Sequence, residues 1–309
     1  MLAIEAGIPA LLIWWIYTDG PTPWWPWLAI SAAAIATLVV MMPWCQFIPY
    51  FARPMAPLGM IVAAGHARGW VSGCASAGFL LVALALIRRQ MNRGSLGQEA
   101  MEISPPLASG VYFVAQGGGS FGVNRHFRNE SQRFALDILR LNWFTMRAWG
   151  FFPPQLDRFA IYNTRVLCPI AGVVTAVVDG LPDMDPWVQQ DAEHIAGNHI
   201  VIRCGAGTDT YVSLAHLLAG SLQVRVGDAV SAGQSLARVG NSGNTTEPHL
   251  HVHAKRGGEP DSMLDGEAVP LRIRGRFLMR NDLFRGLAGQ PPDVSCKDRE
   301  AIPQPLPRA

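Results

Sequence analysis

Charged side chains are distributed very unevenly along this chain of 309 residues. Of its 25 basic and 23 acidic side chains, 48 in total, only Glu5, Asp19, Arg53 and Arg68 fall within the first 87 residues. A segment with so few charges cannot form the surface of a soluble domain on its own, whereas a bilayer accommodates it readily. We therefore expect residues 1–93 to be an α-helical membrane region; a buried helical bundle is the alternative.

Two stretches meet the requirement of about 20 apolar residues for a membrane-spanning helix. Residues 24–44 contain no charge and have tryptophans at both ends, and residues 70–87 are followed by Arg88 and Arg89. Residues 2–17 form a shorter third candidate. Seven of the ten tryptophans lie in this region, near the ends of the proposed spans, as expected for side chains at a membrane interface. The sequence therefore predicts two to three transmembrane helices.

From residue 94 onward, apolar runs of four to nine residues are separated by Gly, Asn, Asp and Pro, which is typical of antiparallel β structure. The expected strands are 110–115, 134–141, 172–178, 199–203, 211–217, 223–226, 235–239 and 249–255. We place a mainly β domain at 94–281 and a flexible, Pro-rich tail at 282–309. A net charge of +2 without a basic run argues against a nucleic-acid partner. A disulfide between Cys168 and Cys204 is one hypothesis, which their spacing alone cannot decide.

Histidines are concentrated in the segment PHLHVHA, residues 248–254. Because side chains alternate along a strand, His249, His251 and His253 would share one face, with neighbours about 6.6 to 6.8 Å apart. Two imidazoles at that spacing can address one metal centre, one as a ligand and the other towards a bound water. The alternative is a row of polar groups on a solvated sheet face.

The surrounding residues 210–255 resemble the lysostaphin or LytM-type zinc endopeptidases of the M23 superfamily. Four family elements occur in order: Tyr211 followed by His216 and Leu217, the turn VGDAVSAGQ at 226–234, the loop GNSG at 240–243, and PHLH at 248–251. With the upstream segments 168–180 and 197–203, the resemblance covers roughly residues 105–256. It implies an antiparallel LytM-like peptidase domain.

The family also requires an upstream histidine and aspartate, and the segment NRHFRNESQRFALD at 124–137 offers His126 and Asp137. Most members place these two residues four apart, whereas here they are eleven apart, which resembles a subgroup with an insertion at this point. The resemblance then implies that one zinc ion is held by His126, Asp137 and His251, with water in the fourth position. It makes His216 and His249 the catalytic residues, which orient or deprotonate the water and stabilise the oxyanion.

His253 departs from the family pattern, in which a Glu or another residue usually stands two positions after the second histidine. We expect it to be a solvated strand residue, the alternatives being a hydrogen bond to a ligand or a position lining the groove. The remaining histidines, His66, His194 and His199, match no family position.

The resemblance implies a membrane-anchored metalloendopeptidase that cleaves peptidoglycan cross-links or stems. Such an enzyme would be a multi-pass protein of the cytoplasmic (inner) membrane, in contact with the lipid bilayer, with its peptidase domain on the periplasmic or wall side. The arginines flanking the spans, two on one side and three on the side of the soluble domain, lean the opposite way.

Three alternatives remain open. A catalytically silent LytM-type domain could bind wall or regulate another hydrolase. A lipoyl or biotinyl carrier shares the VGDAVSAGQ type of turn, but the only lysines, Lys255 and Lys297, are not in the required hairpin. A membrane-bound peptidase could also act on a protein or peptide other than wall.

Overall fold

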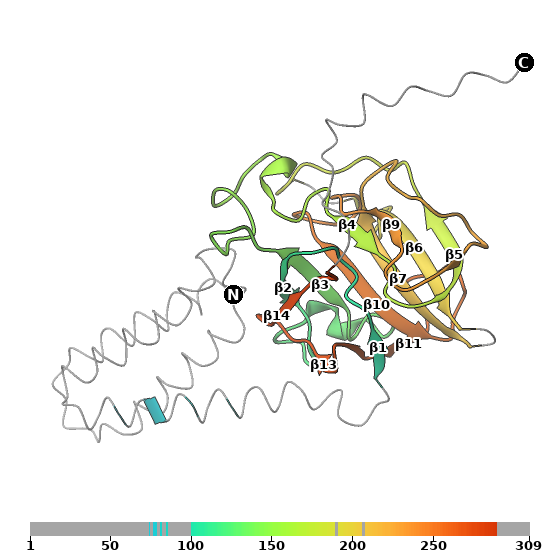
Figure 1. Cartoon of the computed structure of the whole chain (residues 1–309), viewed down its shortest axis with the longest axis horizontal. Helices are drawn as coiled ribbons and strands as arrows, with labels where there is room; N and C mark the ends of the chain where they lie inside the picture. Colours follow the sequence, from blue (N-terminus) through green and yellow to red (C-terminus); the bar gives the residue numbers. More distant parts are fainter. Residues whose placement is uncertain are drawn as a thin grey trace, which may run out of the picture.

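The computed structural model describes residues 74, 77, 78, 81, 85, 100–188, 191–205 and 208–288 (Figure 1). The first five of these are α-helical. Most of the predicted membrane region, 1–93, and most of the predicted tail lie outside the described residues. In the part of the chain that is described, no helix is both long enough and apolar enough to cross a bilayer.

The regular secondary structure of the domain is almost entirely β-strand, as predicted (Figure 1). Nine strands form one sheet: β2 (Val111–Gln116), β3 (Leu136–Arg140), β5 (Gly172–Val178), β6 (Asn198–Cys204), β7 (Thr210–Leu217), β8 (Ala229–Val230), β10 (Leu250–Arg256), β11 (Glu267–Val269) and β14 (Leu283–Arg285). Their order is β14-β2-β3-β10-β7-β6-β5-β8, with β11 paired to β10, and every pair is antiparallel.

Two smaller sheets complete the domain. The strands β1 (Met101–Ile103), β12 (Leu271–Ile273) and β13 (Arg276–Phe277) form one, in which β1 runs parallel to β12. The strands β4 (Arg165–Leu167) and β9 (Ser235–Arg238) form the other. Between residues 100 and 288, the described helical segments are two short 3-10 helices, η4 (Arg125–Arg128) and η5 (Leu156–Arg158).

The main hydrophobic core lies on one face of the large sheet. Alternate residues of the central strands enter it, including Val212 and Leu214 from β7 and Leu250 and Val252 from β10. Leu236 on β9 joins the same core from the opposing small sheet. Burying one face of such strands stabilises the fold by about 25 cal/mol per Å² of apolar surface removed from water. The other face carries the polar side chains of the histidine strand β10 together with a smaller apolar cluster that includes Tyr211, Ala215 and Met263.

Two local details differ from the sequence predictions. Residues 223–226 do not form a strand, and the short strand β8 at 229–230 pairs with β5 instead. At the end of the domain, β14 pairs with β2, so the sheet continues past residue 281, where we placed the start of the tail. Cys168 and Cys204 are both buried as free thiols.

Candidate metal centre

Three adjacent strands bring the predicted site residues together. In the sheet order, β10 lies between β3 and β7. His251 on β10 is directly opposite Asp137 on β3, and on its other side it is opposite Ala215 on β7. This register explains how residues 114 positions apart in sequence become neighbours.

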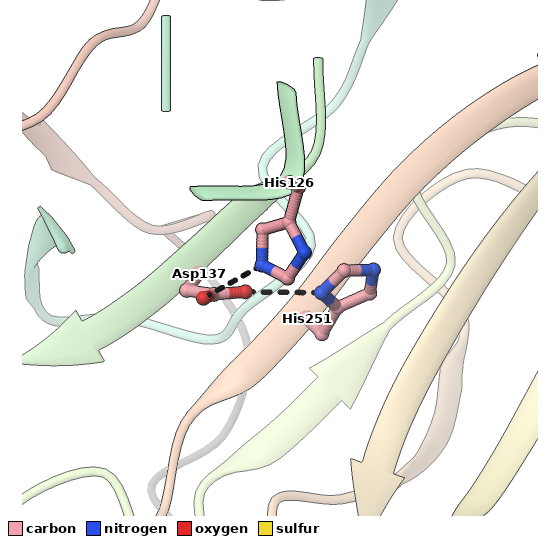
Figure 2. Close-up of side chains that lie close together, drawn as sticks. All are labelled: His126, Asp137 and His251. Carbon is pink, nitrogen blue, oxygen red and sulfur yellow. Dashed lines mark hydrogen bonds and ion pairs between the residues drawn. The ribbon is translucent and has the colours of Figure 1, made fainter. Parts of the chain in front are cut away.

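His126, Asp137 and His251 converge on one point, as Figure 2 shows. The Nε2 atom of His126 lies 3.0 Å from Oδ2 of Asp137, and the Nδ1 atom of His251 lies 3.0 Å from Oδ1 of the same carboxylate. One nitrogen or oxygen atom from each residue can be chosen so that all three atoms are within 4.8 Å of one another. The side chains of His126 and Asp137 are 23% and 13% exposed, so the cluster is shielded from water but still reachable.

The loop that carries His126 is fixed by the buried side chain of Asn124. Its Oδ1 atom accepts a hydrogen bond from the backbone N–H of His126, capping the 3-10 helix η4. Its Nδ2 group donates to backbone carbonyls of Gly118, Arg133 and Ala135. Asn124 thus ties both ends of the inserted segment between His126 and Asp137 together. This explains how the wider spacing of eleven still lets the two side chains meet.

His253 is not a solvated strand residue, which corrects our expectation. Its side chain is 1% exposed, and its Nδ1 atom lies 3.0 Å from Nε2 of His251. If the Nδ1 atom of His251 binds a metal, Nε2 of that ring carries the proton and donates a hydrogen bond to Nδ1 of His253. A hydrogen bond of this kind fixes the tautomer and the orientation of a ligand imidazole. The structure therefore supports the alternative of a hydrogen bond, made here to the candidate ligand His251.

His216 reaches the site because the strand alternation slips near the end of β7. Val212, Leu214 and Leu217 all enter the main core, so one step of the alternation is lost between 214 and 217. The pairing of β6 with β7 shifts register in the same place, and His216 has a left-handed backbone with φ of 62°. Such a conformation is uncommon outside glycine and is often found where a side chain must be re-aimed. The His216 ring consequently lies 4.7 Å from the His249 ring, centroid to centroid.

Backbone carbonyls fix the tautomers of both predicted catalytic histidines. Nδ1 of His216 lies 2.9 Å from the carbonyl oxygen of Ser242, and Nδ1 of His249 lies 2.8 Å from that of Glu247. Since a carbonyl can only accept, each Nδ1 carries the proton and donates it. In the neutral rings, each Nε2 atom therefore has a lone pair. For His249, this atom is 3.7 Å from Oδ1 of Asp137, which places it beside the cluster.

The pKa of each titratable group in the cluster depends on its burial and on its neighbours. Burial acts to raise the pKa of Asp137, but the charges of His126 and His249 and hydrogen bonds from His126 and His251 hold it well below its usual value. Burial, followed by the neighbouring rings, lowers the pKa of His216 well below the ordinary value, and burial also lowers that of His251. For His126, burial opposes protonation, yet Asp137 raises the pKa overall. An ionised carboxylate and neutral imidazoles are the forms that bind metals.

The donor set fits zinc. Zinc in proteins takes imidazole nitrogen and carboxylate oxygen at about 2.0 to 2.2 Å, which puts neighbouring ligand atoms of a tetrahedral site about 3.4 Å apart. The two imidazoles contact different oxygens of Asp137 at 3.0 Å, and one atom from each of the three residues lies within 4.8 Å of the others, so small shifts would bring them around one metal. Three protein ligands leave a fourth position for water or substrate, which is the arrangement of catalytic rather than structural zinc sites.

A cleft of about 260 Å³ opens beside the cluster, with Asp137 and His249 among its lining residues. Thr246 and Glu247 border it from the loop that precedes β10. Glu247 is buried and forms an ion pair with Arg147 at 2.9 Å, which anchors this loop. A peptide lying in the cleft would therefore pass directly over the cluster.

The supporting residues Asn124, Ser242 and Thr245 were not identified from the sequence. Thr245 lies 3.2 Å from Nδ1 of His249 through its Oγ1 atom, and Ser242 also accepts the backbone N–H of Asn198 through its hydroxyl. For Ser242 and Thr245 the signal in the sequence was their position within or beside the turn-rich loop GNSGN at 240–244, and for Asn124 it was the start of the segment 124–137. The sequence cannot say which oxygen atoms of such a loop face a histidine.

Part of the chain matches a known protein family. Residues 156–262, about a third of the chain, match the model described as Peptidase family M23. This segment contains His216, His249 and His251. His126 and Asp137 lie upstream of it, so their place in the cluster rests on the structure and not on the family match.

Several solved structures are similar to parts of this chain. A zinc-containing peptidase from Vibrio cholerae is 24% identical over 37% of this chain and 29% of its own, with a TM-score of 0.25. Lysostaphin from Staphylococcus simulans is 25% identical over 38% and 45%, with a TM-score of 0.21. The M23 metalloprotease pseudoalterin from the deep sea is 15% identical over 60% and 99%, with a TM-score of 0.36. The chain thus spans less than half the length of the first two, and TM-scores of this size do not establish a common architecture.

Proposed function

We propose that the β domain is a zinc metalloendopeptidase that hydrolyses peptide bonds in peptidoglycan cross-links or stems. The observation that carries this proposal is the convergence of His126, Asp137 and His251 within 4.8 Å, beside two further histidines whose tautomers are fixed. The match of residues 156–262 to Peptidase family M23 supports the choice of a peptidase. The wall as substrate comes from the resemblance to LytM-type enzymes.

In this proposal His126, Asp137 and His251 hold the zinc ion through Nε2, a carboxylate oxygen and Nδ1. Zinc at this position would lower the pKa of a coordinated water towards about 7 and polarise the scissile carbonyl. The Nε2 atoms of His216 and His249 supply the proton transfers. Both lone pairs orient the attacking water and one of them accepts its proton; the imidazolium formed in this way then donates a hydrogen bond to the developing oxyanion. The proton then passes to the leaving amine.

The proposal extends to location. A wall substrate requires the domain to lie on the periplasmic or wall side of the cytoplasmic membrane. The charge-poor residues 1–93 would anchor it there. This part of the proposal rests on the sequence alone.

The test uses the full-length chain, purified in detergent. Zinc content is measured together with the release of soluble fragments from purified sacculi, with and without a chelator. We expect one zinc per chain and fragments whose release stops on chelation and resumes with added zinc. Fragment masses would identify the bond.

Two single variants assign the roles in the same assay. His249→Ala and His216→Ala should keep most of the zinc and lose about 100- to 1,000-fold in turnover, because each removes a proton carrier but no ligand. A chain that contains no zinc and releases nothing would favour a silent wall-binding domain. A zinc-loaded chain that cleaves an unrelated protein but not sacculi would retain the peptidase and reject the wall.

A further inference from the structure

Two arginines line the cleft beside the metal cluster. Arg125 precedes His126 on the 3-10 helix η4, and Arg280 comes from the turn between β13 and β14. Both share the cleft with Asp137 and His249. Neither arginine lies in the segment 156–262 that matches the family model, and neither has a part in the proposed chemistry.

Gln116 holds both arginines at the edge of the metal cluster. On β2 it is directly opposite Asp137, at a register shift between β2 and β3. Its Oε1 atom accepts the backbone N–H of Arg125 at 3.2 Å and a guanidinium N–H from Nη2 of Arg280 at 2.5 Å. One side-chain oxygen therefore ties two separate loops to the strand position next to the proposed ligand Asp137.

Two further hydrogen bonds fix Arg280, and a third closes the turn that carries it. Its backbone N–H donates to the carbonyl of Gly117 at 3.1 Å, and its Nε donates to the carbonyl of Ala115 at 2.8 Å. The turn that carries it is closed by a bond from the backbone N–H of Asp282 to the carbonyl of Met279. A guanidinium held in this way loses little conformational freedom when it binds a ligand, because its orientation is already set.

With Arg147, which pairs with the lining residue Glu247, three arginines stand against the two carboxylates of the cleft, an excess of one positive charge. The two lining acids are already engaged: Glu247 pairs with Arg147, and Asp137 contacts His126 and His251 as a proposed metal ligand. Within the described residues, Arg125 has no carboxylate partner. Burial and the nearby charge of Arg125 lower the pKa of Arg280 to about 10, which leaves it protonated at neutral pH. A bound divalent metal would add to this excess.

An excess of positive charge next to a hydrolytic centre selects for a negative group on the substrate. Guanidinium groups bind carboxylates through paired, charge-assisted hydrogen bonds. One residue of an extended peptide spans about 3.3 to 3.6 Å, and the cleft of about 260 Å³ borders the cluster directly. A carboxylate placed there would belong to a residue at or next to the scissile bond.

We propose that Arg125 and Arg280 form a carboxylate subsite, so that the substrate is a peptide with a free carboxylate on a residue flanking the scissile bond. This inference rests on the proposed peptidase function and narrows its substrate class. The carboxylate can be the C-terminus of a stem peptide or a side-chain carboxylate within a cross-link. Both offer the same chemistry to the arginines.

The test compares matched wall peptides with the full-length chain. Cross-linked stem-peptide dimers are prepared as the free acids, as C-terminal amides, as side-chain amides and with both positions amidated. Binding of fluorescent versions is measured on the His216→Ala variant. Residue 216 does not line the cleft, and this variant is expected to turn over slowly. Cleavage is measured separately on the wild type. We expect the acid to bind, and to be cleaved with a kcat/KM, at least about tenfold better than the matching amide.

Variants then assign this preference to the arginines. Arg125→Gln and Arg280→Gln should each reduce the ratio of acid to amide several-fold, and the double variant should bring it near one. Arg128→Gln is the matched control, because Arg128 is exposed on the same 3-10 helix, stacks over Phe121 at 3.9 Å and does not line the cleft. It removes the same charge and should leave the ratio unchanged. The Arg280→Lys variant and thermal melting show whether replacement of Arg280 disturbs folding. If it does, Arg125→Gln alone tests the subsite.

The outcomes separate the subsite from the peptidase function. Equal cleavage of acid and amide by the wild type would overturn the subsite and keep the peptidase. Preferential, arginine-dependent binding of the acid without cleavage would keep the subsite and reject the peptidase. An acid preference that persists in the double variant would place the carboxylate on the metal instead, and would also overturn the subsite. The C-terminal and side-chain amides show which carboxylate is bound.

Discussion

The two ends of one strand face differ sharply in chemistry. His251, His253 and Lys255 follow one another on the same face of β10, and all three are buried. At the His251 end, the neighbours are an aspartate, further imidazoles and a cleft. At the Lys255 end, the ammonium group lies 2.5 Å from Asp265 and 2.7 Å from the carbonyl of Glu259. Identical alternation thus produces a candidate reactive centre at one end and a closed ion pair at the other.

The difference lies in what the other strands and loops contribute. The His251 end receives Asp137 from β3 and leaves lone pairs on imidazole nitrogens, so a cation can be bound there. The Lys255 end receives a carboxylate for its own fixed positive charge, and the ring of Tyr211 lies 5.2 Å from the ammonium nitrogen. The buried ammonium of Lys255 has its counter-charge within the protein. The neutral imidazoles at the other end can instead bind a cation. Variants at the two ends should therefore affect different properties.

The largest effect is expected at the reactive end. His251→Ala removes a proposed zinc ligand, so zinc and peptidase activity should be lost together, the activity by about 1,000-fold or more. In the metal-free chain, the same substitution should have only a small effect on the free energy of unfolding. Zinc content by mass spectrometry, sacculus digestion and chemical denaturation of the same preparations check this. Full zinc retention by His251→Ala would remove the residue from the ligand set.

At the Lys255 end the expected effect is on stability. Asp265→Asn leaves the fully buried ammonium of Lys255 without its counter-charge, which should lower the free energy of unfolding by about 1 kcal/mol, because the 40% exposed Asp265 side chain lets solvent screen the pair. Zinc content should not change. Urea denaturation of the full-length chain measures the loss. The double variant Lys255→Met with Asp265→Asn is the control and should recover part of the stability, because it removes both charges; a double variant less stable than Asp265→Asn would contradict the ion-pair explanation.

Much of the His251 end of β10 could be predicted from the sequence. Alternation placed His249, His251 and His253 on one face, and the motif resemblance selected Asp137 and His126 across a spacing that departs from the family. The antiparallel sheet was also predicted from the short apolar runs. Each of these inferences depends on local periodicity or on a motif, which the sequence displays directly.

Contacts between distant segments could not be predicted in the same way. Whether His253 is solvated depends on the segment around Met263, which packs on that sheet face with Ala215 and Tyr211. The approach of His216 depends on a lost step of alternation and a positive φ, neither of which has a sequence signal at a histidine. The arginine cleft joins the residue before His126 to a turn some 150 residues later. Tertiary register decides all three.

His253 lies between the two ends, and its variants should have an intermediate effect. His253→Ala removes the acceptor for the Nε2 proton of His251, so zinc affinity should fall by about 10- to 100-fold. His253→Gln is the matched variant, since its amide oxygen can accept the same proton and should restore much of the affinity. Competition with a zinc-binding dye measures both. Equal affinities for wild type and His253→Ala would show that His253 only fills space.

The smallest effect is expected from acid titration of Asp265 at the Lys255 end. The hydrogen bond from Lys255, together with one from the backbone of Glu259, lowers the pKa of Asp265 to about 2. A carboxylate with a depressed pKa contributes stability above its unfolded pKa, near 4, and loses that contribution as the pH falls towards 2. Because the Asp265 side chain is 40% exposed, solvent screening limits the contribution to at most about 1 kcal/mol. Urea midpoints between pH 5 and pH 2 should therefore fall slightly more steeply for the wild type than for Asp265→Asn. Parallel curves would mean that the depressed pKa of Asp265 adds nothing to folding, and that burial of Lys255 is sustained by the carbonyl of Glu259 and the ring of Tyr211 instead.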